Sequence, residues 1–394
     1  MSTDIRPPST VVIDGTVSPG FEPVLAAFAD NAVLRGDTSA SCAVYLDGEL
    51  VVDLWTGTAT GYTADSRPCV FSVSKGVTAL CLLMAVEDGH LELDAPVVRY
   101  WPEYAAGGKE HTTVRQVLSH RAGLPWPEQD LTVTELAQWH PVAAALAAQS
   151  PAWEPGTAFA YHPLTIGWLA GEILRRATGE RPSQWLQARI AEPLHVDVTY
   201  GRPSGDPTYR PMTDPLPILD MEAAAAMQQL ALNPDLVRAL SLGGVLDPAD
   251  LFGSVNRDDL MACELPAANL VSSARSLARL YAAASGEVDG IRLLSPATLW
   301  DAMRVQSEGQ PFLGLDEGNR WGTGFMITSP RRPMSGHGSF GHDGAGGHLA
   351  FGNLDQGLGF GYVTGRPGGI PDDRANSLCA ALRTCLGLRA QETA

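Results

Sequence analysis

The sequence of 394 residues has no long apolar run and no cluster of basic residues. Its longest apolar stretch, residues 77–86, is too short for a membrane-spanning helix, which needs about 20 apolar residues. The formal net charge of −17 makes nucleic acid and anionic membrane surfaces unsuitable partners. The first 15 residues lack the basic start and apolar centre of a secretory signal. We therefore expect a cytoplasmic protein that binds neither membranes nor nucleic acid.

Patterns typical of metal and nucleotide sites are also missing. The six cysteines form no Cys-x-x-Cys pair, so we expect free, mostly buried thiols. The separations among His337, His342 and His348 match no zinc signature. A Gly-x-Gly-x-x-Gly run at 336–341 precedes a β-like segment and does not join a strand to a helix, so it is interpreted as a turn. The sequence predicts neither a metal nor another cofactor.

Lysine is almost absent. Only two of the 27 basic residues are lysine, Lys75 and Lys109, and all the others are arginine. Since arginine supplies positive charge elsewhere, a lysine is most informative where a guanidinium cannot replace it. A guanidinium cannot lose a proton near neutral pH, whereas a lysine amine can when its pKa is lowered.

Lys75 closes a Ser-x-x-Lys motif that begins at Ser72. Residues 72–88 form an apolar run that ends at Gly89, so the motif falls on the first turn of a predicted helix, where positions i and i+3 meet. A serine becomes a nucleophile when a neighbouring base takes its proton, and a desolvated lysine can be that base. The alternative is an N-cap serine followed by a solvent-facing lysine. Apolar residues on both sides of Lys75 favour its burial and the catalytic interpretation.

Strand-like segments are confined to the two ends of the chain. Residues 41–57 contain two β-rich runs around Asp47-Gly48, a strong hairpin signal, and β-like runs return near the C-terminus. These later runs cover 321–328, 348–351 and 358–364. No strand alternation is visible between 90 and 270, where helical patterns prevail. Helices are predicted at 21–35, 72–88, 114–119, 134–149, 164–178, 182–192, 221–240, 274–286 and 373–386.

This order of segments predicts an α/β fold. An antiparallel sheet flanked by helices is assembled from both termini, and a mostly helical domain is inserted between its halves. We expect the sheet domain to comprise residues 1–75 and 270–394, and the helical domain to comprise 76–269.

Four motifs in order along the chain resemble those of the serine β-lactamase and penicillin-binding-protein superfamily, and in particular its class C-like family VIII carboxylesterases. They are Ser72-x-x-Lys75, LSHRAGL at 118–124, PGTAFAYHPLTIGWLAGEILRRATG at 155–179, and FGHDGAGGHLAF at 340–351. The similarity extends from about residue 20 to 385. It implies a β-lactamase-like fold and an acyl-enzyme formed on the serine.

The resemblance also implies roles for residues outside the first motif. Tyr161 corresponds to the catalytic tyrosine that shares a proton with the serine and lysine, and we expect a phenol beside an ammonium group to have a lowered pKa. His342-Asp343-Gly344 occupies the place of the family's Lys-Thr-Gly strand, along which substrate lies, so His342 and Gly344 are candidate substrate-binding residues. The backbone N–H groups of Ser72 and Ala345 would form the oxyanion hole.

Departures from the family pattern narrow the substrate. Tyr161 is followed by His162-Pro163, where peptidases and β-lactamases of the superfamily place an Asn two residues after the tyrosine. Histidine also replaces the strand lysine. Both changes favour small carboxylic esters over β-lactams and cell-wall peptides. Trp126 and Trp153 are candidates for an acyl pocket, although each fits a core position equally well.

Several alternatives to a carboxylesterase stay open at this point. The same acyl-enzyme could serve an acyltransferase acting on a small metabolite, a weak β-lactamase, or a D-amino-acid peptidase or amidase. A non-catalytic binding protein on this fold is a further alternative, which the joint presence of the serine, lysine and tyrosine disfavours. An α/β-hydrolase is disfavoured because the chain has no Gly-x-Ser-x-Gly elbow. The sequence leaves open whether copies of the chain form a homo-oligomer.

Overall fold

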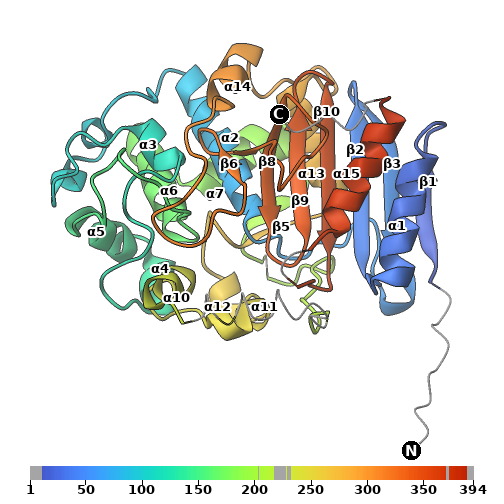
Figure 1. Ribbon diagram of the computed structural model, residues 1–394, viewed down its shortest axis with the longest axis horizontal. Coiled ribbons are helices and arrows are strands. Elements are labelled where there is room, and N and C mark those ends of the chain that lie inside the picture. The colour runs from blue at the N-terminus through green and yellow to red at the C-terminus, as the bar shows by residue number, and fades with distance from the viewer. Residues whose placement is uncertain (1–10, 203, 217–227, 229–231, 370–371, 388–394) are drawn as a thin grey trace, which may run out of the picture.

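An eight-stranded antiparallel sheet joins the two ends of the chain (Figure 1). The structure, a computed structural model, describes residues 11–202, 204–216, 228, 232–369 and 372–387. In spatial order the strands are β1 (Ile13–Val17), β3 (Glu49–Thr56), β2 (Ala40–Leu46), β10 (Leu358–Thr364), β9 (His348–Asn353), β8 (Ser339–Gly344), β7 (Met326–Ile327) and β6 (Arg320–Trp321). Because β2 pairs with β10, residues 13–56 and 320–364 share one sheet. This confirms the prediction of an antiparallel sheet built from both termini.

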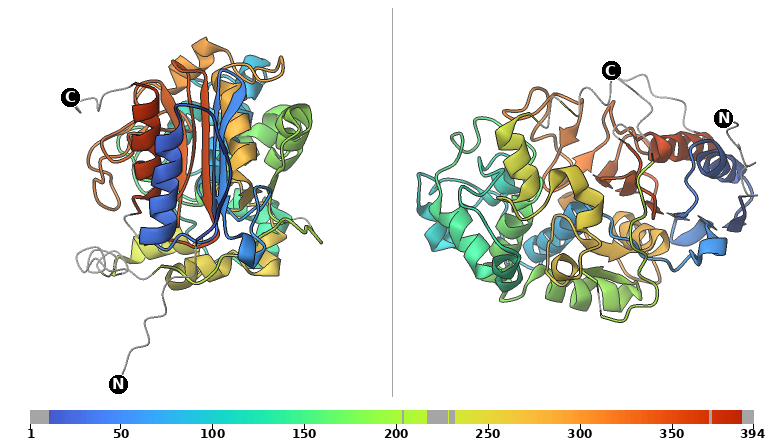
Figure 2. Two further views of the ribbon diagram at one scale, coloured as in Figure 1. Left: turned by 90° about the vertical axis from the view of Figure 1, so that its right-hand side faces the viewer. Right: turned by 90° about the horizontal axis from the view of Figure 1, so that it is seen from below.

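Helices cover both faces of this sheet (Figure 2). The helices α1 (Glu22–Leu34) and α15 (Arg374–Cys385) lie side by side on one face, and α13 (Ala274–Ser285) crosses the other. Glycines on β10 let α13 approach closely, because a Cβ at Gly359 would lie 2.0 Å from the carbonyl oxygen of Ala278. The rings of Phe360 and Tyr362 pack on the opposite face. The alternation in the β10 sequence LGFGYVT thus turns small residues toward α13 and aromatic residues toward α1 and α15.

The helix α2 (Val73–Glu87) lies between the sheet and a helical region (Figure 1). Its residues from Val73 to Ala85 are all buried, as the apolar sequence predicts. The other helical segments are η1 (Thr58–Thr60), η2 (Val97–Arg99), η3 (Pro102–Ala105), α3 (Val114–Leu118), α4 (Val133–Gln138), α5 (His140–Ala148), α6 (Thr165–Thr178), α7 (Pro182–Leu186), the π-helical η4 (Gln187–Ala191), α8 (Glu192–Leu194), α10 (Pro234–Ser241), η5 (Pro248–Asp250), α11 (Leu251–Ser254), α12 (Asp258–Met261) and α14 (Pro296–Ala302).

The strongest local signals in the sequence correspond to observed elements. The β2–β3 hairpin turns at Asp47 and Gly48, which both have positive φ as a tight hairpin requires. The predicted helices at 21–35, 164–178 and 373–386 are α1, α6 and α15.

The expectation of one helix over 134–149 is wrong, because α4 ends before Trp139 and α5 begins after it. Trp139 has a φ of 67°, and Pro141 follows two residues later. Proline restricts the residue before it and cannot donate to the preceding turn, so a continuous helix is broken here.

One pair of short strands was not predicted. The expectation of no strand between 90 and 270 is wrong, because β4 (Val198–Tyr200) pairs with β5 (Leu270–Ser272) in a two-stranded sheet. Three residues are too few to show alternation. The predicted helix at 221–240 is seen only in its last part, as α10, because residues 221–227 and 229–231 lie outside the described residues.

Candidate active site

Ser72 lies half-buried at the N-cap of α2. Phe71, the residue before it, has a φ of 48°, in the left-handed region that residues with a β-carbon rarely adopt. The backbone N–H and Oγ of Ser74 both donate to the Phe71 carbonyl, and the Phe71 ring packs between those of Phe252 and His348. Such a conformation costs about 1–3 kcal/mol and persists only where its surroundings hold it. Here it fixes the direction in which the serine hydroxyl leaves the turn.

Two polar groups meet at the serine oxygen. The Lys75 Nζ and the Tyr161 hydroxyl each lie 2.9 Å from Ser72 Oγ. The Nζ also donates to the carbonyl oxygen of Ala267 at 2.8 Å and lies 4.9 Å from the centre of the Tyr161 ring. Ser72 and Lys75 are one turn apart on α2, and Tyr161 comes from the loop before α6. The structure therefore brings the three sequence-predicted groups within hydrogen-bonding distance.

The amine of Lys75 lies in an apolar part of α2. Burial lowers the pKa of Lys75 well below its ordinary value, and the negative charge of Asp343 opposes this only in part. A lowered pKa favours the uncharged amine, which has a lone pair available. The geometry and the burial together give Lys75 what a proton acceptor needs.

The expected lowering of the Tyr161 pKa is wrong. Burial raises the pKa of Tyr161 above its ordinary value, and the hydrogen bond with Ser72 offsets only part of that effect. The expectation assumed an ammonium group beside the phenol, but a buried Lys75 favours its uncharged form and supplies no charge to stabilise a phenolate. Tyr161 therefore keeps its proton and is a hydrogen-bond donor to the serine oxygen.

The turn between β8 and β9, residues 345–347, lies against the segment that leads to Ser72. A Cβ at Gly344 would lie 2.3 Å from the carbonyl oxygen of Val70, so only glycine allows this approach. The Gly347 N–H donates to the Gly344 carbonyl at 3.2 Å and closes the turn. The backbone N–H groups of Ser72 and Ala345 donate to no acceptor among the described residues. Two unused donors are thus available, one at the start of α2 and one on this turn.

His342 is buried beside the tyrosine. Its Nδ1 donates to the carbonyl oxygen of Asp343 at 2.6 Å, and its ring centre lies 6.0 Å from that of Tyr161 and 5.4 Å from that of Trp321. Burial lowers the pKa of His342 to about 4, so the imidazole is neutral near pH 7. Its Nε2 is buried and has no hydrogen-bond partner in the described part of the chain.

The family model for beta-lactamases matches residues 29–382. The chain belongs to the beta-lactamase family. It is 34% identical over 362 residues to the esterase/beta-lactamase LipL of Mycobacterium tuberculosis, a match that covers 89% of this chain and 82% of LipL. The family resemblance and the α/β fold read from the sequence are thereby confirmed.

Solved structures of esterases share the fold over nearly the whole chain. A family VIII carboxylesterase superposes with a TM-score of 0.83 at 30% identity, covering 95% of this chain and 100% of the other. EstA from Arthrobacter nitroguajacolicus superposes with a TM-score of 0.82 at 35% identity, covering 95% of this chain and 99% of the other.

No role was predicted from the sequence for His120, which lies within the motif at 118–124. The N–H of Ala160 donates to the His120 carbonyl, and the N–H of His162 donates to His120 Nδ1, each at 3.2 Å. These two bonds hold the backbone on both sides of Tyr161. Because burial, helped by the neighbouring His162, lowers the pKa of His120 well below its ordinary value, the ring stays neutral and keeps Nδ1 as an acceptor.

Trp321 was also missed. Its ring stacks on that of Tyr161, with centres 5.2 Å apart and planes 21° apart, and it lies 4.8 Å from the His120 ring. The residue sits on the two-residue strand β6 at the far end of the sequence, with no motif around it. Only the fold brings this ring to the tyrosine.

The two tryptophans proposed for an acyl pocket differ in their surroundings. Trp153 is buried, and its ring lies 5.9 Å from that of His162 and 4.7 Å from that of Phe312. Through His162 and His120 it is linked to Tyr161 by successive ring contacts. Trp126 is half-buried, and its carbonyl accepts an N–H from the side chain of Gln149.

His162 serves the fold. Its Nε2 accepts the Leu124 N–H at 3.0 Å, and its Nδ1 donates to the Ala160 carbonyl at 2.6 Å. Burial lowers the pKa of His162 to about 4, so the neutral ring keeps this donor and acceptor assignment. Both nitrogens are occupied, and Pro163 has no amide side chain. Neither residue replaces the missing Asn.

Within the described ranges, no group of three or more His, Cys, Asp or Glu side chains is arranged to hold a metal ion. In the same part of the chain, no helix combines the length and apolar character needed to cross a bilayer.

Proposed function

We propose that this protein is a serine esterase that hydrolyses small carboxylic esters through an acyl-enzyme on Ser72. The observation that carries the proposal is the meeting of Lys75 Nζ and the Tyr161 hydroxyl at Ser72 Oγ, each 2.9 Å away. Membership of the beta-lactamase family and the likeness to carboxylesterases support the same activity.

In the proposed mechanism, the uncharged Lys75 amine accepts the Ser72 hydroxyl proton as the serine oxygen attacks the ester carbonyl. The N–H groups of Ser72 and Ala345 stabilise the oxyanion that forms. When the C–O bond to the alcohol breaks, Tyr161 donates its proton to the departing alkoxide and recovers one from the Lys75 ammonium. Water then attacks the acyl-enzyme, loses its proton to the same groups, and releases the acid and the serine hydroxyl.

The polar groups around the serine support esters as the substrate class. A β-lactam or peptide presents an amide that needs a hydrogen-bonding partner, but position 163 is proline and both His162 nitrogens are occupied. His342, in the place of the strand lysine, is neutral and buried, so it supplies no charge for a substrate carboxylate. A neutral ester needs neither a hydrogen-bonding partner for an amide nor a positive charge for a carboxylate. His342 and Gly344 remain proposed substrate-binding residues on the edge of β8.

An apolar patch supports a hydrophobic group on the ester. Phe312 is 53% exposed, and its ring contacts that of Trp153 at a tilt of 37°. Its N–H donates to the carbonyl of Phe159, two residues before Tyr161, at 2.7 Å. We propose that Trp153 and Phe312 hold the alkyl or aryl part of the substrate, with Trp126 as the further sequence-based candidate. Phe312→Ala should then lower kcat/KM for a hexanoate ester and spare the acetate, whereas the exposed Leu50→Ala should change neither.

The proposal includes a cytoplasmic location. All six cysteines are free thiols, as in proteins of reducing compartments. The net charge of −17 supports a small-molecule substrate and argues against nucleic acid as a partner. Cell fractionation and gel filtration with light scattering would test the location and the oligomeric state.

A panel of substrates tests the activity. The purified protein should hydrolyse short-chain p-nitrophenyl esters, and Ser72→Ala should abolish turnover and labelling by a fluorophosphonate without lowering the melting temperature. A chromogenic cephalosporin and a D-amino-acid amide should react far more slowly than the ester. Adding a competing alcohol and analysing the products distinguishes acyl transfer from hydrolysis. An active Ser72→Ala variant would refute the assignment.

A further inference from the structure

Arg374 is a cation in an unfavourable place. It is the first residue of α15, where the helix dipole disfavours positive charge, and its side chain is 2% exposed. Burying a guanidinium costs several kcal/mol before its partners are counted, and an apolar replacement of a buried ion pair is often as stable. Stability alone therefore gives a weak account of this residue.

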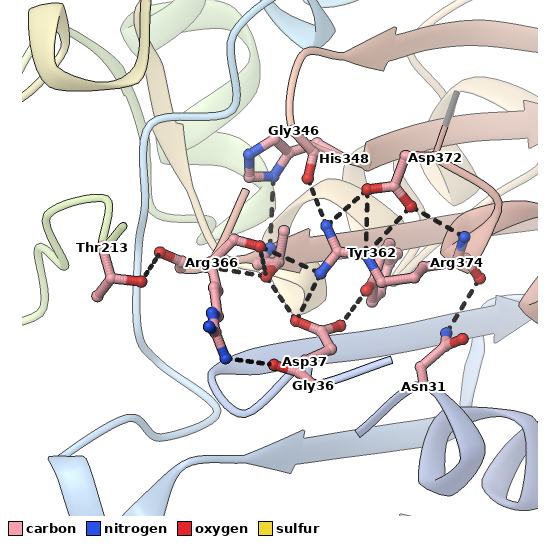
Figure 3. Close-up of polar contacts among 12 residues, drawn as sticks. Asn31, Gly36, Asp37, Thr213, Gly346, His348, Tyr362, Arg366, Asp372 and Arg374 are labelled. Carbon is pink, nitrogen blue, oxygen red and sulfur yellow. Dashed lines mark hydrogen bonds and ion pairs between the residues drawn. The ribbon is translucent and has the colours of Figure 1, made fainter. Parts of the chain in front are cut away.

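Two buried carboxylates hold the guanidinium (Figure 3). Its Nη1 lies 2.9 Å from Asp37, and its Nη2 lies 2.6 Å from Asp372. Asp37 is itself fixed by the hydroxyls of Tyr362 and Thr364, on β10. The side chain of Arg374 is thus held in one orientation by the loop before β2, by β10 and by the start of its own helix.

In that orientation Arg374 forms a hydrogen bond with the turn between β8 and β9. Its Nη2 donates to the carbonyl oxygen of Gly346 at 2.7 Å (Figure 3). The Gly368 N–H donates to the same oxygen at 3.0 Å. A Cβ at Gly347 would lie 2.5 Å from Asp372 and 2.8 Å from Arg374 Nη2, so the turn packs directly on the ion cluster. Gly346 follows Ala345, whose free N–H is the proposed oxyanion donor.

We propose that Arg374, oriented by Asp37 and Asp372, is a positioning residue that sets the Ala345 N–H in the oxyanion hole. The Gly346 carbonyl shares its peptide plane with the Gly347 N–H, which donates to the Gly344 carbonyl at 3.2 Å. The Gly344 carbonyl in turn shares its peptide plane with the Ala345 N–H. Holding the Gly346 carbonyl therefore also restrains, through this hydrogen bond, the plane that carries the Ala345 N–H. This inference rests on the proposed function, because it assigns the cluster a part in the same reaction.

The test uses Arg374→Lys and Asp372→Asn in the full chain. A lysine supplies one charge but cannot bond two carboxylates and the Gly346 carbonyl with a planar fork. Loss of one oxyanion donor costs roughly 10²–10³ in kcat, so partial misplacement should lower kcat by roughly 10- to 100-fold. KM should change little, since the ground-state carbonyl is bound less tightly than the oxyanion.

A reversible trifluoromethyl ketone inhibitor gives a measurement that would not change if Arg374 had only a structural role. It forms a tetrahedral adduct on the serine, so its Ki should rise by the same factor as kcat/KM falls across the two variants. Substrate affinity measured in the Ser72→Ala background should stay constant. Arg275→Met is the matched control. Arg275 also bridges two aspartates, Asp53 and Asp65, but it belongs to α13, on the other face of the sheet from α15.

The outcomes separate this inference from the proposed function. If wild type hydrolyses esters and both folded variants keep kcat and Ki, Arg374 has no positioning role and only this inference fails. If Arg374→Lys does not fold, Asp372→Asn decides alone. If wild type has no esterase activity, the proposed function fails first.

Discussion

The two lysines of this chain are both buried, yet their surroundings differ. Lys109 Nζ donates to three carbonyl oxygens, those of Ala106, Ala147 and Gln149, and lies 5.3 Å from the centre of the Tyr104 ring. Lys75 Nζ donates to one carbonyl and one hydroxyl. Burial lowers the pKa of both amines. The pKa of Lys109 falls to about 8, and that of Lys75 falls well below its ordinary value.

The difference shows that burial alone does not make a lysine into a base. At neutral pH Lys109 is an ammonium group whose three N–H donors match three acceptors, two at the end of α5 and one just after η3, so its proton is held in the structure. Lys75 has fewer acceptors and a serine hydroxyl beside it, which favours the uncharged amine. Arginine is excluded at both sites for different reasons: at Lys75 it cannot give up a proton, and at Lys109 a planar group cannot point at three converging oxygens.

Exchange of each lysine for arginine should produce the largest contrast. In Lys75→Arg the charge stays but the proton acceptor is lost, so kcat/KM for a short aryl ester should fall by about 10²–10⁴. In Lys109→Arg the kcat/KM for the same ester should stay within about twofold of wild type, because substitutions away from an active site rarely change its activity. Initial rates normalised to folded protein measure both. Equal losses in the two variants would mean that the two lysines do not differ in the way described.

Replacement of each lysine by methionine should have the opposite order of effects, because the larger loss, now a loss of stability, should occur at Lys109. Lys109→Met leaves the two buried carbonyls of Ala147 and Gln149 without this donor, at about 1–3 kcal/mol for each unsatisfied group, so the free energy of unfolding should fall by about 2 kcal/mol or more. Lys75→Met removes a desolvated amine and should leave the protein as stable as wild type or more so, as often happens at active sites. Urea unfolding monitored by circular dichroism gives both values. A large loss in Lys75→Met would assign that lysine a structural role.

The pH dependence should separate the two amines further. The uncharged Lys75 is the active form, so kcat/KM should be constant above its lowered pKa and fall about tenfold per pH unit below it. For Lys109 the unfolded chain binds more protons than the folded one between about pH 8 and its ordinary pKa of 10.5, so the free energy of unfolding should rise with pH across that window.

The control for this pH dependence is Lys109→Arg. It should abolish the rise in stability and leave the acid limb of the rate profile unchanged. If that limb moves in Lys109→Arg, the base is not Lys75.

The smallest effect should come from the residues behind Lys75. The Tyr200 hydroxyl lies 2.6 Å from Oγ1 of Thr78, one turn further along α2. Tyr200→Phe should cost about 1 kcal/mol of stability and change kcat/KM by less than about threefold. Tyr281→Phe is the matched control, because the buried Tyr281 hydroxyl has no partner among the described residues, so its removal should not destabilise the protein. Thermal melts measure both.

The sequence was sufficient for elements with strong local signals. The hairpin at Asp47-Gly48 and the long apolar helix from Val73 are specified by residues close together in the chain. The strands β4 and β5 have three residues each and show no periodicity, so their pairing depends on partners that are distant in the chain. The β-like run predicted at 321–328 forms two strands of two residues each, β6 and β7, which pair with each other. The break at Trp139 was visible in Pro141 but was outweighed by the helical pattern around it.

The site residues divide in the same way, into those with a local signal in the sequence and those that depend on distant contacts. Ser72 and Lys75 were found from their spacing on one helix, while Tyr161 and Ala345 came only through the family resemblance. His120 and Trp321 were missed because their importance lies in contacts with Tyr161 that no local pattern encodes. The raised pKa of Tyr161 could not be foreseen either, since it depends on how deeply the fold buries the phenol.

The pairing of β2 with β10 has a consequence for biosynthesis. Residues 40–46 leave the ribosome about 300 residues before their neighbour in the sheet, residues 358–364, has emerged. Until then this edge of the N-terminal hairpin is exposed, and the turn that carries Ala345 has not yet docked beside the serine. A nascent chain should therefore be inert toward esters in the cell, and hydrolysis should begin only once residues 358–364 have been made and have paired with β2.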